Sequence, residues 1–217
     1  MKQNQTKQLV LTALFAAIII IMASVPFLGY IPLGLMNATI IHIPVILGAL
    51  FLGPKKGAFL GFLFGLTSLI KATFTPLPTS FVFSPFYTFE GMNGGINSLI
   101  VCFIPRILIG ITSYYIFKLI VSVGKSKKGA RSAGFIAAGL VGSLTNTLLV
   151  MYGIFFLFGE NYAHAYEASG NVIATTLHAL ILSVIGTQGV PEAIVAAVIV
   201  LGVGQILARL FPLYGEN

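Results

Sequence analysis

Charged residues are scarce in this chain. Only 8% of its 217 residues are charged and only five are acidic, whereas 57% are apolar. A soluble domain carries roughly a quarter charged residues. This scarcity excludes a water-soluble globular fold, because the surface of such a fold needs far more polar side chains.

Cysteine, tryptophan and the common catalytic motifs are also missing. Cys102 is the only cysteine, which excludes an internal disulfide and a thiolate metal cluster, and there is no tryptophan. The sequence has no glycine-rich phosphate loop with its lysine, no HExxH motif, no evident Ser-His-Asp set and no paired carboxylates within an apolar run. An enzyme needs such a polar cluster, and an ion pump needs acidic relays at the membrane centre. We therefore expect neither of these classes and no metal site.

Long apolar runs dominate what is present. Residues 9–28 and 190–210 each hold about 20 nearly uncharged residues, the length that crosses a hydrocarbon core of roughly 30 Å. The fold class predicted is an all-α integral membrane protein, a bundle of six transmembrane helices that forms one membrane domain over residues 1–217. The helices are predicted at about residues 7–28, 37–52, 57–70, 98–123, 132–158 and 190–210. For residues 172–185 we expect a surface or re-entrant helix, because that apolar stretch is short for a crossing.

Basic residues gather in alternate connections between these runs. They are Lys2, Lys7, Lys55, Lys56, Lys125, Lys127, Lys128, Arg131 and Arg209. The acids Glu90, Glu160, Glu167 and Glu192 lie in or beside the other connections. Since Lys and Arg in short loops stay cytoplasmic, the pattern predicts that both termini are cytoplasmic. The net charge of +7 therefore reports membrane orientation rather than nucleic-acid binding.

Arg106 lies inside an apolar run. It is about eight residues into the predicted fourth helix, hence roughly 12 Å below its outer end. A charge at that depth is costly and usually faces a cavity or a substrate path. Guanidinium also grips a carboxylate through two parallel hydrogen bonds. Two interpretations stay open for Arg106, a structural ion pair with Glu192 or contact with an anionic ligand.

Small and polar residues mark several helix faces. Gly57, Gly61 and Gly65 are spaced by four, which predicts close helix packing within the chain. Ala13 and Ala17 repeat this spacing, and both internal packing and contact with a partner subunit stay open for them. Asn146 would need hydrogen-bond partners in hydrocarbon, from a neighbouring helix or from a ligand. Asn37 and Thr39 are polar residues of the second predicted helix.

His42 also lies within an apolar run of the sequence. It lacks the Cys, Asp or second His of a metal site. A structural role is favoured, and a ligand hydrogen bond and proton coupling are the alternatives.

Three segments together resemble one known family. They are Ala13-x-x-x-Ala17, the stretch IIHIPVILG at 40–48 followed by LGPKKG at 52–57 and Gly61/Gly65, and IPRILIG at 104–110. They resemble segments of the substrate-capture subunits, or S components, of energy-coupling factor (ECF) vitamin transporters. The resemblance covers about residues 7–210.

This resemblance implies a mode of action. A six-helix bundle would capture a vitamin at its extracellular face with high affinity. It would then topple within the membrane, driven by a transmembrane coupling subunit and two cytoplasmic ATPase subunits. Ala13 and Ala17 look like the family's docking motif for the coupling subunit. The chain would be a multi-pass protein of a prokaryotic plasma membrane, without a cofactor of its own because the partner subunits use the ATP.

The substrate is suggested by the run YIPLGLMNATI at 30–40, which looks most like the pantothenate branch of the family. Pantothenate is a flexible carboxylate with hydroxyls and an amide. The candidate ligand-binding residues are Arg106 for the carboxylate, and Asn37, Thr39, His42, Asn93, Asn97 and Asn146 for polar contacts.

Other functions stay open at this point. S components for pyridoxine, hydroxymethylpyrimidine, nicotinate or folate are alternatives, and nicotinate and folate are also carboxylates. A stand-alone secondary transporter would need coupling-ion residues and usually an internal repeat, and we find neither in the sequence. A structural subunit without a ligand would leave Arg106 and the polar outer loop predicted at residues 71–97 unexplained.

Overall fold

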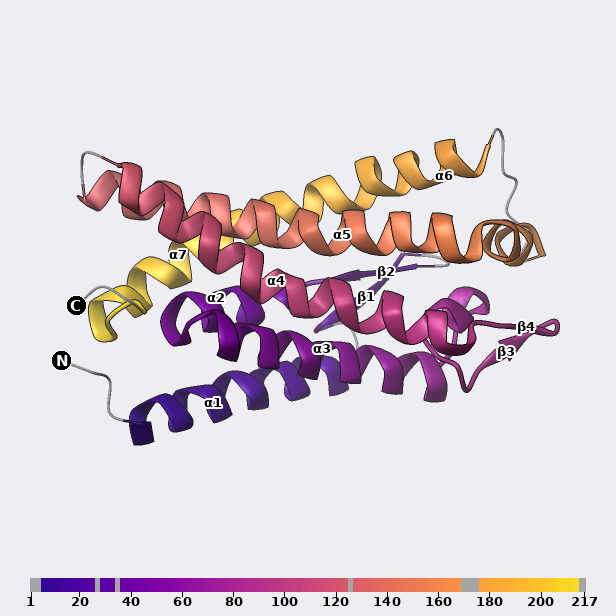
Figure 1. Ribbon diagram of the computed structural model, residues 1–217, viewed down its shortest axis with the longest axis horizontal. Coiled ribbons are helices and arrows are strands. Elements are labelled where there is room, and N and C mark those ends of the chain that lie inside the picture. Colours follow the sequence, from indigo (N-terminus) through magenta and orange to yellow (C-terminus); the bar gives the residue numbers. More distant parts are fainter. Residues whose placement is uncertain (1–4, 26–27, 34–35, 125–126, 169–175, 215–217) are drawn as a thin grey trace.

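A computed structural model describes residues 5–25, 28–33, 36–124, 127–168 and 176–214 (Figure 1). For residues 31–33, 36–38, 127 and 128 it describes the backbone only. The helices are α1 (Gln5–Ser24), α2 (His42–Leu52), α3 (Pro54–Phe74), α4 (Gly95–Val123), α5 (Lys127–Ala168), α6 (Leu177–Val184) and α7 (Val190–Leu210). The shorter elements are a 3₁₀ turn, η1 (Pro78–Val82), a π-helical turn, η2 (Ile185–Gly189), and the antiparallel hairpins β1 (Tyr30–Leu33) with β2 (Met36–Thr39) and β3 (Thr88–Phe89) with β4 (Met92–Asn93).

In the described part of the chain, five helical segments are long and apolar enough to cross a membrane. They are α1, α3, α4, α5 from Gly129, and the continuous segment α6–η2–α7 (Leu177–Leu210). They run along the long axis of the molecule, and α1 begins at the same end of the bundle at which α7 finishes (Figure 1). This architecture agrees with the predicted helical membrane protein.

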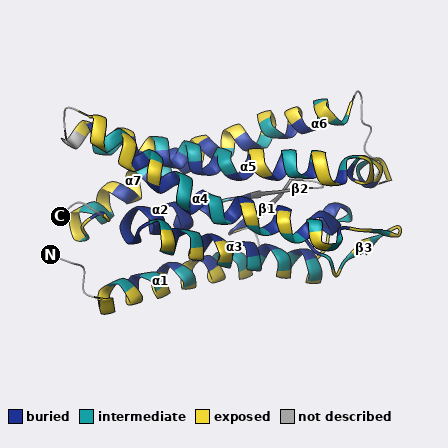
Figure 2. Cartoon of the chain, in the orientation of Figure 1, coloured by how far each residue is buried: buried dark blue, intermediate teal, exposed yellow. Residues whose placement is uncertain are grey.

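The outer faces of the long helices are apolar and exposed (Figure 2). Helix α1 shows the pattern clearly, since it buries Leu11, Phe15 and Ile19 while Leu9 and Leu14 are more than half exposed. Water would disfavour so much exposed apolar surface, whereas lipid chains solvate it without penalty. These faces are therefore the lipid-facing surface of the bundle.

The second predicted helix is shorter than expected. Residues 37–39 belong to strand β2, which pairs with β1 from Tyr30↔Thr39 to Leu33↔Met36, and α2 begins only at His42. Pairing of the two strands satisfies the backbone groups on their facing edges, and non-helical backbone is tolerated at membrane depth where protein surrounds it. All 11 residues of α2 are buried. This length is below the roughly 20 residues that one helix needs to span the hydrocarbon core.

The last two predicted helices are longer than expected. Helix α5 continues to Ala168 instead of ending near residue 158. The expected surface or re-entrant helix at 172–185 is wrong for the residues described, from 176 onward, because α6 continues through η2 into α7. Pro191 has no N–H to donate, and the turn before it changes to the π pattern, in which the Val190 N–H bonds to the Ile185 carbonyl. The π turn therefore carries the helix past the proline.

The other helix ends differ from the prediction by a few residues. Helix α1 covers 5–24, α3 covers 54–74 and α4 covers 95–123. The extension of α3 has a consequence for the cavity described below, because Lys71 lies in the helix and not in an outer loop.

The glycine ladder of α3 packs on α4. A Cβ atom on Gly61 would overlap the carbonyl oxygen of Arg106, and one on Gly110 would overlap the backbone of Gly57. Gly65 faces Cys102 and Phe103 in the same way. The prediction that these glycines pack within the chain is confirmed, and their contact holds α3 directly against the turn of α4 that carries Arg106.

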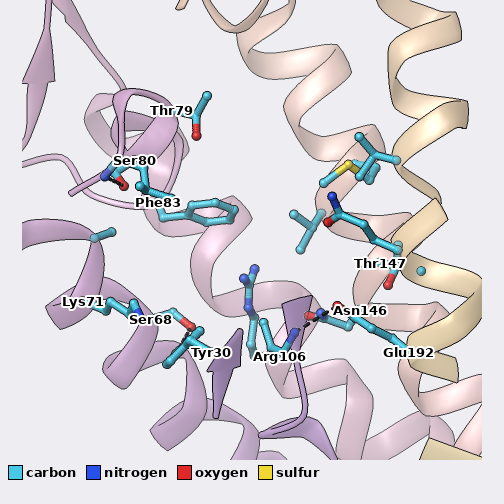
Figure 3. Close-up of a pocket in the computed structure, with 18 of the residues that line it drawn as sticks. Tyr30, Ser68, Lys71, Thr79, Ser80, Phe83, Arg106, Asn146, Thr147 and Glu192 are labelled. Carbon is cyan, nitrogen blue, oxygen red and sulfur yellow. Dashed lines mark hydrogen bonds between the residues drawn. The ribbon is translucent and has the colours of Figure 1, made fainter. Parts of the chain in front are cut away.

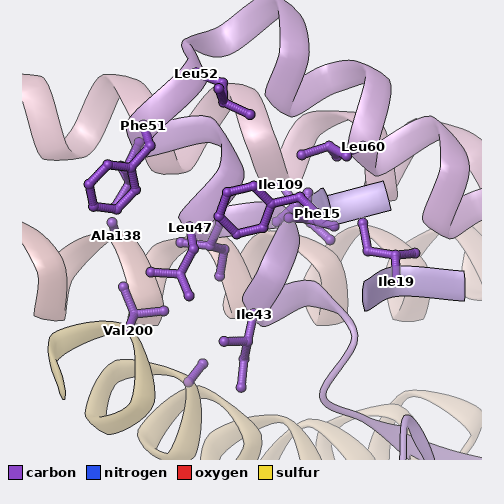
Figure 4. Close-up of a cluster of buried hydrophobic side chains, with 14 of the residues drawn as sticks. Phe15, Ile19, Ile43, Leu47, Phe51, Leu52, Leu60, Ile109, Ala138 and Val200 are labelled. Atoms are coloured by element: carbon purple, nitrogen blue, oxygen red, sulfur yellow. The ribbon is translucent and has the colours of Figure 1, made fainter. Parts of the chain in front are cut away.

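The larger hydrophobic core surrounds α2 (Figure 4). Side chains from four long helices and α7 meet those of α2, among them Phe15, Ile19, Ile43, Leu47, Phe51, Leu60, Ile109, Ala138 and Val200. A second cluster joins η1, α4, α5 and α6, and includes Phe81, Val101, Ile154, Phe158, Tyr162 and Ile181. The candidate site described next borders on both clusters.

Candidate functional site

A cavity lies inside the bundle, between the β1–β2 hairpin, α3, η1, α4, α5 and the α6–α7 segment. The empty space within it, counted together with the open solvent at its mouth, is about 870 Å³. Its lining is Tyr30, Thr39, Ser68, Lys71, Ala72, Thr75, Leu77, Thr79, Ser80, Phe83, Arg106, Asn146, Thr147, Val150, Met151, Tyr162, Val184, Gln188, Gly189 and Glu192.

Arg106 is the most deeply buried cation of this cavity. Its side chain is 5% exposed, and its guanidinium carbon lies 5.1 Å from the centre of the Phe83 ring and 5.7 Å from that of Phe64. Nη1 donates to the carbonyl of Val101 at 2.7 Å. That carbonyl would ordinarily accept from the N–H of residue 105, and Pro105 has none. The guanidinium therefore satisfies the backbone acceptor that its proline neighbour leaves free.

The rest of the Arg106 guanidinium is short of partners. Nε is buried and makes no hydrogen bond within the described residues. Glu192 also lines the cavity, but the described residues contain no ion pair between the two side chains. A buried charge without a partner is costly and is typical of a group that meets its partner in a ligand.

A second cation comes from α3. The Lys71 ammonium lies 4.3 Å from the centre of the Tyr30 ring. The Tyr30 hydroxyl is hydrogen-bonded to Ser68 Oγ at 2.9 Å and to Thr67 Oγ1 at 3.3 Å. Lys71, Ser68 and Tyr30 lie on one side of Arg106, and Thr147 and Glu192 lie on the other (Figure 3).

Two further polar atoms in the cavity wall lack partners. Asn146 on α5 is 7% exposed and its Oδ1 makes no hydrogen bond in the part of the chain described. Thr39, at the end of β2, is 9% exposed, and its Oγ1 makes no hydrogen bond among the described residues either. Its backbone N–H donates to Glu192 Oε1 at 2.9 Å, which ties the hairpin to α7. Arg106, Asn146 and Thr39 thus bring unsatisfied polar atoms into one cavity from three separate elements.

The other candidate residues lie elsewhere. His42 is fully buried at the start of α2 and outside the cavity lining, and neither ring nitrogen makes a hydrogen bond among the described residues. Asn93 is exposed, where its amide donates to Pro85 O and Thr88 Oγ1. Asn97 lies in the first turn of α4 and does not line the cavity. The side chain of Asn37 lies outside what the structure describes.

Several cavity residues were not expected from the sequence. Ser68 and Lys71 continue the glycine face of α3, at three and six residues beyond Gly65. Helical spacing is therefore the sequence signal that could have identified them. Gln188 and Gly189 belong to the π turn, which local hydropathy does not reveal. Tyr162 lies beyond the predicted end of α5.

The charged and hydrogen-bonding groups of the cavity suit the binding of a small polar molecule. No group of three or more His, Cys, Asp or Glu side chains in the described part of the chain is arranged to hold a metal ion. The charged residues that line the cavity in that part are Lys71, Arg106 and Glu192. Hydroxyl and amide groups surround them, so the cavity fits a small polar ligand with an anionic group.

Ala13 and Ala17 do not line the cavity. Both are exposed on α1, whereas Leu11, Phe15 and Ile19 turn the opposite face of the helix into the core. The two alanines therefore offer a smooth strip on the outer surface, since no described side chain covers them.

Comparison with known proteins extends over nearly the whole chain. A family model described as "ECF transporter, substrate-specific component" matches residues 7–204. The chain is 35% identical over 201 residues to the pantothenic acid transporter PanT of Lactococcus lactis subsp. cremoris, an alignment covering 91% of this chain and 98% of that protein. It is 30% identical over 219 residues to the pantothenate transporter PanT of Leuconostoc mesenteroides subsp. mesenteroides, with 97% and 96% of the two chains covered.

Proposed function

Because this chain belongs to the substrate-specific components of ECF transporters, we propose that it is the high-affinity pantothenate-capture subunit of such an importer. Membership confirms the family suggested by the sequence. It makes the chain a multi-pass prokaryotic membrane protein that acts in transport and is not an enzyme. The substrate, the partner subunits and the orientation are parts of the proposal.

The observation that supports pantothenate as the substrate is the incompletely paired guanidinium of Arg106 in the wall of a polar cavity. Pantothenate has one carboxylate, and guanidinium can bind a carboxylate through two parallel hydrogen bonds. Lys71 adds a second positive charge to the same cavity, and Glu192 is its one acidic side chain among the described residues. A ligand with a single negative charge therefore leaves the occupied cavity electrically neutral.

The uncharged part of pantothenate also has suitable partners. Its amide needs one acceptor and one donor, and the side-chain amide of Asn146 offers both. Thr39, Ser68 and Thr147 supply hydroxyl groups, while Val150 and Met151 give an apolar surface for the two methyl groups of the ligand. We retain Asn37, His42, Asn93 and Asn97 only as weaker candidates, because none of them has a described side chain in the cavity lining.

The proposed partners are a transmembrane coupling subunit and two cytoplasmic ATPase subunits. The exposed strip of Ala13 and Ala17 supports docking on the coupling subunit, because small residues let two helices approach closely in lipid. The partner subunits would use the ATP, and this chain would hold no cofactor.

The proposed topology has six crossings with both termini in the cytoplasm. The β1–β2 hairpin and α2 would together make the second crossing, since α2 alone is too short. The shared end of the bundle at which α1 begins and α7 finishes supports an even number of crossings (Figure 1).

Calorimetric titration of the purified chain in detergent tests the substrate directly. We expect tight binding of pantothenate, in the nanomolar range, and no comparable binding of nicotinate, pyridoxine or folate. Tight binding of one of the other vitamins would keep the family and contradict the pantothenate assignment. Co-purification of ATPase subunits with the tagged chain from its native membrane would test the partners separately.

A further inference from the structure

The charged residues that line the cavity come from different helices. The cations come from neighbouring helices, Lys71 from α3 and Arg106 from α4, whereas Glu192 comes from α7 (Figure 3). Helix α3 packs on α4, α4 packs on α5, and α5 packs on α7. The cavity wall therefore runs from a positive side, through the amide of Asn146 on α5, to a negative side.

Glu192 follows the π turn and lines the cavity together with three residues that precede it. Val184, Gln188, Gly189 and Glu192 all line the cavity, and they follow one another along one face of the continuous α6–α7 segment. Oε1 accepts from the Thr39 N–H, and Oε2 makes no hydrogen bond within the described residues. A partly buried carboxylate thus presents a free acceptor oxygen to the cavity.

We propose that Glu192 recognises the hydroxyl groups of the ligand and thereby sets the direction in which the ligand binds. This inference rests on the proposed function. An ionised carboxylate repels the carboxylate of the ligand but accepts hydrogen bonds from O–H groups. Pantothenate carries its carboxylate at one end, its amide in the middle and its hydroxyls at the other end. That order matches Arg106 with Lys71, then Asn146, then Glu192.

The same carboxylate has a structural role to separate from this one, because it ties the hairpin to α7 through Thr39. Glu192→Gln makes the separation possible. The amide oxygen of glutamine still accepts from the Thr39 N–H, while the charged acceptor is lost. Glu160→Gln is the matched control, since Glu160 is exposed on α5 and outside the cavity lining.

The test compares three ligands by calorimetry or by competition against pantothenate. They are pantothenate, pantothenol, which replaces the carboxylate by CH₂OH, and N-(3,3-dimethylbutanoyl)-β-alanine, which lacks both hydroxyls. Hydrogen bonds to a charged group predict that Glu192→Gln weakens pantothenate and pantothenol by about 10- to 100-fold. The ligand without hydroxyls should change by less than about threefold, and Glu160→Gln should leave all three affinities unchanged.

Two other outcomes of these binding measurements would contradict the proposed role of Glu192. An equal loss for all three ligands would show that Glu192 only holds the hairpin, and unchanged pantothenate binding would show that it takes no part in recognition. Either result overturns this inference while leaving the proposed function intact. If the unmodified chain binds none of the three ligands, the proposed function fails and this inference fails with it.

Discussion

Replacing Arg106 with alanine should separate ligand binding from folding. The lost contact with a carboxylate is a charge-assisted pair of hydrogen bonds, worth a few kcal/mol, so pantothenate should bind about 10- to 1,000-fold more weakly. The effect on stability should be smaller, because two consequences oppose each other. Removing an incompletely paired buried charge is favourable, whereas the Val101 carbonyl loses its donor, which costs about 1–3 kcal/mol.

A second variant isolates the backbone part of this effect. Pro105→Ala combined with Arg106→Ala restores an N–H that can donate to the Val101 carbonyl within α4. We expect the double variant to unfold at a higher temperature than Arg106→Ala alone and to bind pantothenate equally poorly. Thermal unfolding in detergent and calorimetric titration of both variants measure the two quantities separately.

One combination of results would refute this reasoning about Arg106. If Arg106→Ala kept the affinity of the unmodified chain and lost thermal stability, the guanidinium would be a structural donor to Val101 and not a ligand contact. Recovery of ligand affinity in the Pro105→Ala double variant would point the same way, since it would show that the backbone of α4 had been disturbed.

Two further predictions concern helix surfaces. Ala13→Leu or Ala17→Leu should leave pantothenate affinity unchanged but abolish co-purification with the coupling subunit, with Val10→Leu, at another exposed position of α1, as the control that assembles normally. Gly61→Ala should lower both the unfolding temperature and the ligand affinity, because its Cβ overlaps the Arg106 backbone. Gly202→Ala, where a Cβ meets no atom within 4 Å, should be neutral or slightly stabilising. Equal effects of the two glycine changes would contradict the close packing of α3 on α4.

The candidate site could be predicted from the sequence only in part. Arg106 and Asn146 were visible because a charge or an amide in an apolar run is costly whatever surrounds it. Thr39 was also proposed, though in a helix that proved to be a strand. Lys71 falls just beyond residue 70, the predicted end of the third helix, whereas α3 continues to Phe74, and Gln188 lies in a π turn that precedes Pro191.

The sequence by itself determined the membrane class, the family and the approximate position of most long helices. These depend on local hydropathy and on short motifs, which each segment carries independently of its neighbours. Only the tertiary structure decided that residues 36–39 form a strand, because a four-residue strand in an apolar run cannot be told from helix by its period. It also decided that Lys71, Arg106, Asn146 and Glu192 share one cavity, since their convergence depends on how four distant helices pack together.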